Sequence, residues 1–191
     1  MQIANTLQWL WMRCQVFVFN LLGLNQQTMQ CLRVMQQLRP ADFFVLTTLA
    51  HFLGQERRTR PEAIGLLRQA LLQQNDNAAL HFNLGFLLEQ QALLAEAESS
   101  FRLAISFNDK LDRAWYGLGL VLIQQGRSEE AVQALRRNTE LQPMSPFGWY
   151  QLARLHLDRQ ETEQALEIIR HLQGFEPKIA EQLKRETGLR P

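Results

Sequence analysis

Few residues of this chain have the types and spacing that catalysis or metal binding would need. Four histidines are present, at His51, His81, His156 and His171. No two of them show the HExxH spacing of a zinc site. The two cysteines have no CxxC spacing, so we expect them to be small buried apolar residues and not a disulfide or a metal site. No nucleophile-elbow pattern or phosphate-binding glycine loop is present. The sequence therefore predicts no enzyme, no cofactor and no metal.

Length and composition narrow the class of protein further. The chain has 191 residues, and its formal net charge of +1 gives no reason to expect nucleic acid as a partner. Six prolines and ten glycines are few, and no Ser-, Gly- or Pro-rich linker divides the chain. We expect either one domain or an all-α solenoid with a continuous core.

Large and small apolar residues recur with a period of about 34 residues. The clearest copy contains Trp115, Leu118, Gly119, Leu122, Ala131, Leu135 and Pro143. The following copy contains Trp149, Leu152, Ala153, Ala165, Ile169 and Pro177. The preceding copy contains Leu84, Gly85, Leu88, Ala97, Phe101 and Ala104. Because Trp115, Leu118 and Leu122 share one helix face, each copy predicts a helix hairpin. Within it, Gly119 and Ala131 are expected to form the close contact between the two helices.

This period and this order of residues resemble the tetratricopeptide repeat, in the form found in small bacterial proteins of that family. The resemblance implies an all-α, right-handed superhelical solenoid of antiparallel helix hairpins. We expect an N-terminal helical hairpin at residues 1–42, which is alternatively a degenerate repeat. A degenerate repeat follows at 43–77, and three repeats follow at 78–111, 112–145 and 146–179. A C-terminal cap helix is expected at 180–191.

The degenerate repeat and the cap helix follow from weaker patterns. The degenerate repeat is indicated by Leu46, Leu49, Ala50, Leu53, Ala63, Leu67 and Ala70. Pro61 is expected to begin its second helix, where the missing N–H costs nothing. After Pro177, an apolar stripe of Ile179, Ala180 and Leu183 among charged residues predicts a helix that covers the last repeat.

The resemblance also indicates where a partner would bind. In this family the concave wall comes from the first helix of each hairpin, and it binds polypeptides. The corresponding positions here are Phe44, His51, Phe82, Asn83, Phe86, Gln90, Arg113, Tyr116, Leu120, Gln124, Phe147, Tyr150, Gln151 and Arg154. They include no lysine, which argues against a clamp for acidic C-terminal tails. We expect an apolar peptide segment with an acidic flank near Arg113 or Arg154.

The N-terminal segment differs from the rest in composition. It has no acidic residue before Asp42 but contains Arg13, Arg33 and Arg39. A helical stripe is formed by Leu7, Leu10, Trp11, Cys14, Phe17, Leu21 and Leu22, and further apolar residues lie off it. The segment is too often interrupted to span a membrane and lacks the features of a signal peptide. Three alternatives stay open: packing on the second repeat, a homodimer interface and a helix at a membrane surface.

The most direct functional hypothesis is a protein-protein interaction scaffold or adaptor that binds a protein or peptide partner and no nucleic acid. One alternative is a chaperone for an exported or membrane-destined client, because the chain is similar in size and layout to small bacterial chaperones of type III secretion translocators. Another is an assembly scaffold held on a membrane by the N-terminal amphipathic helix. We expect a cytoplasmic location, or a peripheral one on the inner membrane.

Overall fold

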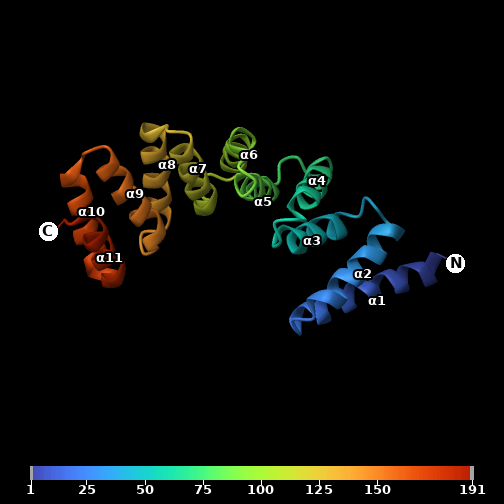
Figure 1. The fold of residues 1–191 in the computed structure, drawn as a ribbon. Helices are drawn as coiled ribbons and strands as arrows, with labels where there is room; N and C mark the ends of the chain where they lie inside the picture. The colour runs from blue at the N-terminus through green and yellow to red at the C-terminus, as the bar shows by residue number, and fades with distance from the viewer. Residues whose placement is uncertain (1, 190–191) are drawn as a thin grey trace. The chain divides into compact units, whose positions relative to one another are not determined.

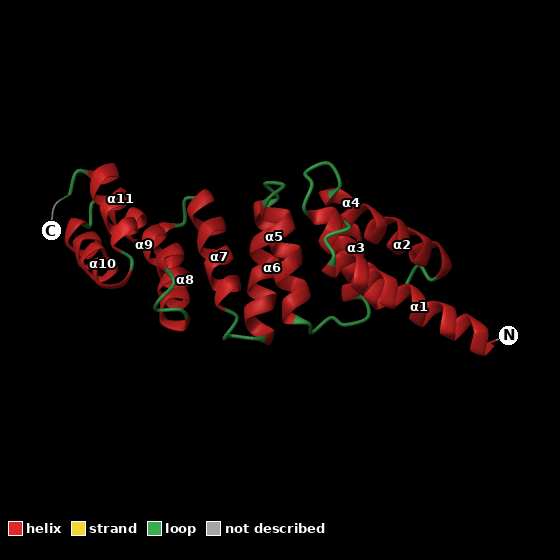
Figure 2. Cartoon of the chain, turned by 90° about the horizontal axis from the view of Figure 1, so that it is seen from below, coloured by secondary structure: helices red, strands yellow, loops and turns green. Residues whose placement is uncertain are grey.

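A computed structural model describes residues 2–189 of the chain, with side chains from residue 6 onward. Over these residues the chain forms helices and no strand (Figures 1 and 2). The helices are α1 (Gln2–Leu21), α2 (Asn25–Leu38), α3 (Phe43–Gly54), α4 (Arg60–Leu71), α5 (Ala78–Glu89), α6 (Leu94–Phe107), α7 (Asp112–Gln124), α8 (Ser128–Leu141), α9 (Pro146–Asp158), α10 (Thr162–Phe175) and α11 (Pro177–Thr187). The expected all-α architecture of helix hairpins is confirmed.

The chain divides into two compact units, and the boundary between them falls within the sequence of α5. The first unit ends at Leu87 and the second begins at Leu88. In the first unit, α1 packs on α2, α2 on α3 and α3 on α4. In the second unit, each helix from α6 to α11 packs on the next, and α11 also contacts α9. Each unit therefore builds its core between neighbouring helices, as stacked hairpins do.

The weak repeat in the first unit has the register that its spacing predicts. Its apolar positions are buried, namely Leu46, Leu49, Ala50, Leu53, Ala63, Leu67 and Ala70. Asp42 caps α3, because its Oδ1 accepts a hydrogen bond of 3.1 Å from the backbone N–H of Val45. The helix α4 begins at Arg60, one residue before the expected Pro61, which lies in its first turn.

A hydrogen bond that recurs in three hairpins explains part of the repeat pattern. Trp115 Nε1 donates to the carbonyl oxygen of Asp109 at 2.8 Å, and Trp149 Nε1 donates to that of Pro143 at 2.9 Å. His81 replaces the tryptophan one repeat earlier, and its Nε2 lies 2.8 Å from the carbonyl oxygen of Asn75. Since a carbonyl oxygen only accepts, Nε2 of His81 carries the hydrogen. Each ring thus ties the start of its helix to the loop six residues earlier.

Three turns in the second unit use a left-handed backbone. Gly126 has φ +74°, and the equivalent positions in the neighbouring repeats are Ala92, with φ 58°, and Gln160, with φ 62°. This conformation costs a residue with a Cβ roughly 1–2 kcal/mol of conformational energy, and glycine has no such cost. No other atom lies within 4 Å of a Cβ built on Gly126, so only the backbone angle requires glycine there.

We therefore predict that Gln160→Gly stabilises the second unit by roughly 0.5–1 kcal/mol, because it removes strain at the cost of some unfolded-state entropy. Gly126→Ala should destabilise the same unit by about 1 kcal/mol, because it introduces that strain. Urea denaturation of both variants measures the two changes. Equal shifts in the same direction would contradict the role of the backbone angle.

Gly119 of α7 packs closely against α8, and Leu135 takes part in this contact. A Cβ built on Gly119 would lie 2.8 Å from Cγ and Cδ2 of Leu135, so Leu135 is the side chain nearest to Gly119. Ala131 is itself fully buried. The sequence also gave no sign that Gly117 is packed against α6, where its Cβ would lie 2.5–2.9 Å from the ring of Phe101. Trp115, on the same helix, is half-buried.

The helix α1 buries a different face from the one that its apolar stripe predicts. Trp9, Met12 and Val16 are buried, whereas Trp11 and Phe17 are exposed. Cys14 is exposed and Cys31 is half-buried, so the expectation of two buried cysteines is wrong. Apolar residues therefore occur on both sides of α1, and the side that packs in the core is the one outside the predicted stripe. None of the helices in residues 2–189 has the length and apolar character needed to cross a membrane.

Candidate functional site

The predicted groove residues all lie at least partly on the surface, on the first helices of the hairpins or in the turn after α5. Phe44 and His51 belong to α3, and Phe82, Asn83 and Phe86 to the part of α5 in the first unit. The remaining predicted residues belong to the second unit and are Gln90, Arg113, Tyr116, Leu120, Gln124, Phe147, Tyr150, Gln151 and Arg154. None of them is fully buried.

In the first unit, three predicted residues line one apolar pocket of about 170 Å³ that is open to solvent. They are His51, Asn83 and Phe86. The rest of the lining consists of Thr47, Ala50, Gly54, Gln55, Leu67 and Leu87. The Phe86 side chain is 49% exposed, so it remains available to a ligand. The pocket thus offers an aromatic surface with an amide and an imidazole at its edge.

The lack of a side chain at Gly54 keeps α3 close to α5 at this pocket. A Cβ there would lie 2.9 Å from Cδ2 of Leu87. Leu87 is buried, and it lines the pocket beside Phe86. The pocket is therefore a product of the hairpin packing and not of a flexible loop.

Two predicted residues of the first unit lie elsewhere. Phe44 is half-buried, and the guanidinium carbon of Arg13 lies 4.4 Å from the centre of its ring. This cation–π contact ties α1 to α3. Phe82 is half-buried and does not line the pocket. The structure thus brings together His51, Asn83 and Phe86, but not Phe44 or Phe82.

In the second unit, four predicted residues line an open pocket of about 250 Å³. They are Tyr116, Phe147, Tyr150 and Gln151, together with Pro146 of α9. The third side of the pocket is formed by Ile179 and Gln182 of α11, which the sequence did not indicate as site residues. Phe147 is 67% exposed and is the most accessible aromatic ring in this set.

The helix α11 also changes the electrostatics of the predicted site. The hydroxyl of Tyr150 donates a hydrogen bond of 2.7 Å to Oε2 of Glu186, and Arg154 Nη1 lies 3.5 Å from the same hydroxyl. The hydrogen bond with Tyr150 raises the pKa of the Arg154 guanidinium, and the charges of Glu186 and Asp158 raise it further. Arg154 already has acidic neighbours from this chain, so it is a poor anchor for an acidic flank of a partner.

An acidic side chain that the sequence did not single out lies among the other predicted residues. Glu89 accepts hydrogen bonds of 2.9 Å from Nε2 of Gln124 and from Nε2 of Gln90. Burial raises the pKa of the Tyr116 hydroxyl, a hydrogen bond from Gln151 opposes this, and the charge of Glu89 adds to the increase. This part of the surface is therefore polar and includes the carboxylate of Glu89.

The arrangement suits the recognition of a polypeptide segment. Exposed aromatic rings and amides provide apolar contact and hydrogen bonds, which are the contacts that hold a polypeptide segment. Within the described residues, no group of three or more His, Cys, Asp or Glu side chains is placed to hold a metal ion. Leu120 is half-buried and Arg113 is exposed, and neither lines the pocket of the second unit.

Two models of the tetratricopeptide repeat match the sequence, one over residues 52–112 and the other over residues 112–143. The matched segments coincide with helices α4 to α8 and with the recurring ring hydrogen bonds of His81 and Trp115. The chain is a tetratricopeptide-repeat (TPR) protein. TPR hairpins form scaffolds for protein–protein interaction, and this protein shares that general character. No match was found among curated proteins.

Solved structures of TPR proteins share the fold over most of the chain. A structure of MamA aligns with a TM-score of 0.80 at 16% identity, over 100% of this chain and 99% of that one. YrrB, described as a TPR protein with an unusual peptide-binding site, aligns with a TM-score of 0.75 at 17% identity, over 89% of this chain and 88% of YrrB. PilF of Pseudomonas aeruginosa gives a TM-score of 0.71 at 20% identity, over 93% and 92% of the two chains. At these identities the likeness concerns the fold alone.

Proposed function

We propose that this TPR protein binds an apolar segment of a polypeptide partner on the surface of its first helices. The observation that supports this most is the apolar pocket of the first unit, where Phe86 is half-exposed beside His51 and Asn83. An exposed aromatic ring in a concave site is a typical energetic anchor of a protein interface. Phe147 provides a second such ring in the second unit.

The charges near these rings favour an apolar and uncharged segment over an acidic one. Glu89 adds negative charge beside Tyr116, and Glu186 and Asp158 offset the charge of Arg154. A carboxylate of the partner would therefore gain little from Arg154. The amides of Asn83 and Gln151, next to the apolar surfaces, can hydrogen-bond the backbone of the bound segment. A peptide-binding site is also named for YrrB, which has the same fold.

We predict that Phe86→Ala and Phe147→Ala each weaken partner binding about thirtyfold, which corresponds to roughly 2 kcal/mol. Phe86 is 49% exposed and Phe147 is 67% exposed, so thermal melts of the variants should be close to that of the wild-type protein. A partner identified by affinity capture and mass spectrometry would be purified, and its affinity measured by calorimetry. Leu72→Ala is the matched control, because Leu72 is 86% exposed and lies outside both pockets.

Two results would contradict the proposal. If the Phe86 and Phe147 variants bind as tightly as Leu72→Ala, the pockets are not the binding surface. If they lose stability and binding falls only with the unfolded fraction, the rings are structural. The same partner also separates an adaptor from a chaperone, because a chaperone client is insoluble when expressed without this protein and an adaptor's partner folds alone.

A further inference from the structure

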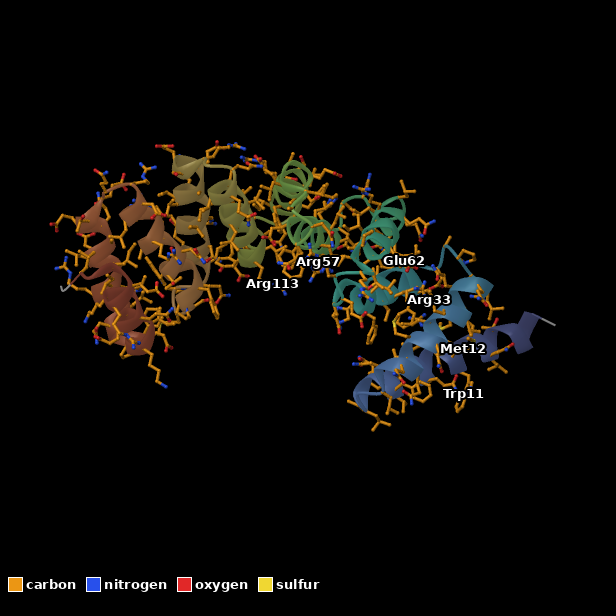
Figure 3. The ribbon with its side chains drawn as sticks, viewed as in Figure 1. Trp11, Met12, Arg33, Arg57, Glu62 and Arg113 are labelled. Carbon is orange, nitrogen blue, oxygen red and sulfur yellow. The ribbon has the colours of Figure 1, made fainter. Side chains whose placement is uncertain are left out.

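The helix α1 carries apolar side chains on two opposite faces. One face packs against the rest of the first unit through Trp9, Met12 and Val16. The opposite face exposes large apolar residues to solvent, and Figure 3 shows Trp11 on the side away from α2. The exposed residues are Leu7, Leu10, Trp11, Phe17, Val18 and Leu21, with Leu22 in the following turn. We call this set, together with the exposed Cys14, the outer face of α1.

The outer face is symmetric about Cys14. Six of its seven large apolar residues lie three, four and seven positions before Cys14 and three, four and seven positions after it, and Leu22 lies outside this pattern. This is also the spacing of a heptad seam, in which one helix packs along another. In an antiparallel pair of identical helices centred on Cys14, residues at equal offsets face each other. The facing pairs are Leu7 with Leu21, Leu10 with Val18, Trp11 with Phe17, and Cys14 with its own copy.

The charges around α1 favour protein over lipid as the occupant of this face. Arg13 is the only charged residue in residues 1–24, and its guanidinium lies over Phe44. Arg39 lies over the ring of Trp9, and Arg33 forms a bidentate ion pair with Glu62. A helix that binds a membrane surface usually has several basic side chains along its rim to attract anionic headgroups. Here the three arginines of the segment are engaged within the protein.

The size of the outer face also matches a dimer. Seven of its side chains are large and apolar, and about half to three-quarters of each is exposed. At roughly 100–150 Å² for each of them, they expose on the order of 800 Å², which is close to what one partner buries in a standard interface. The face exceeds the apolar patch of about 300–600 Å² that is typical of a monomer.

We propose that two copies of this chain associate through α1, as an antiparallel helix pair with a two-fold axis close to Cys14. A two-fold interface presents the same surface on both subunits, and the symmetric spacing meets that requirement. The seam carries no charged side chain, so nothing in it repels the second copy. The interface lies on α1 and does not involve the pockets on α3, α5, α7 and α9, so it is independent of the proposed function.

The arrangement is tested by exchanging charges between facing positions in the full-length chain. Trp11→Glu alone buries two carboxylates against Phe17, and Phe17→Lys alone buries two ammonium groups against Trp11. Each should raise the dissociation constant of the dimer at least about hundredfold, which light scattering with size-exclusion chromatography detects as monomer. The double variant places Glu and Lys opposite each other twice and should restore the dimer. Leu72→Glu is the control and should remain dimeric.

A second measurement probes the axis through the cysteine. In a Cys31→Ala background, a short bismaleimide should join the two copies of Cys14 into a covalent dimer, and Cys14→Ser should abolish the product. The proposal is overturned if the wild-type chain is monomeric at micromolar concentration. It is also overturned if the double variant stays monomeric, because in a parallel pair position 11 faces position 11. Flotation of monomeric protein with anionic vesicles would assign the outer face to lipid instead.

Discussion

Replacing Phe101 with alanine is expected to lower the free energy of unfolding of the second unit by about 3–5 kcal/mol. Phe101 is 1% exposed on α6, and its ring fills the space left by Gly117 on α7. Gly117 has no side chain that could move into the cavity. The two helices would therefore lose contact over the whole ring and not only at its edge.

Urea denaturation followed by circular dichroism measures this change, with an expected decrease in the midpoint of about 2 M. Phe107→Ala is the matched control, because Phe107 lies on the same helix and is about half exposed. It should cost less than about 1 kcal/mol. Equal effects of the two substitutions would show that α6 does not pack on α7 through Phe101. A Gly117→Ala variant should be destabilised by about 1–3 kcal/mol, because its Cβ meets the same ring.

The two tryptophans of α1 are expected to behave oppositely. Trp9→Ala should lower the stability of the first unit by about 3–5 kcal/mol, because the ring is 7% exposed and carries Arg39 on its face. Trp11→Ala should change the stability of the monomer by no more than about 0.5 kcal/mol, because that ring is 64% exposed. The two residues are of one type on one helix, so each is the other's control.

The comparison is made in a Phe17→Glu background, so that self-association does not add to the stability of either variant. Thermal and urea denaturation of the Trp9 and Trp11 variants at several protein concentrations supply the measurement. A larger loss for Trp11→Ala than for Trp9→Ala would mean that α1 packs through its outer face. The proposal of an α1 dimer would then fail as well.

The repeat period predicted most of the fold. The spacing of Leu118, Leu122, Ala131 and Leu135 places these residues in the core, and all of them are buried. The weaker repeat before them also has the predicted register. This works because each hairpin can bury its apolar face only against its neighbours, so the same positions must be apolar in every copy. The repeat pattern in the sequence and the packing of the hairpins therefore both require apolar residues at these positions.

The candidate site was predicted less completely. The positions of His51, Asn83 and Phe86 on first helices follow from the period, and the structure places these residues at one pocket. The contribution of α11 could not follow from it, because Ile179 and Gln182 lie outside the repeat pattern. Nor did the sequence distinguish Glu89 from other surface acids, since its hydrogen bonds with Gln90 and Gln124 depend on how the helices pack.

The sequence by itself determined the class of fold, the hairpin register and the absence of recognisable catalytic motifs, because these depend on spacing along one helix or between equivalent positions. Only the tertiary structure decided which face of α1 is buried. Both faces are apolar, so the pattern alone favoured the wider stripe through Trp11 and Phe17. The structure buries Trp9, Met12 and Val16 instead, because these side chains fit the surface that α2 and its neighbours offer, and the wider stripe remains exposed.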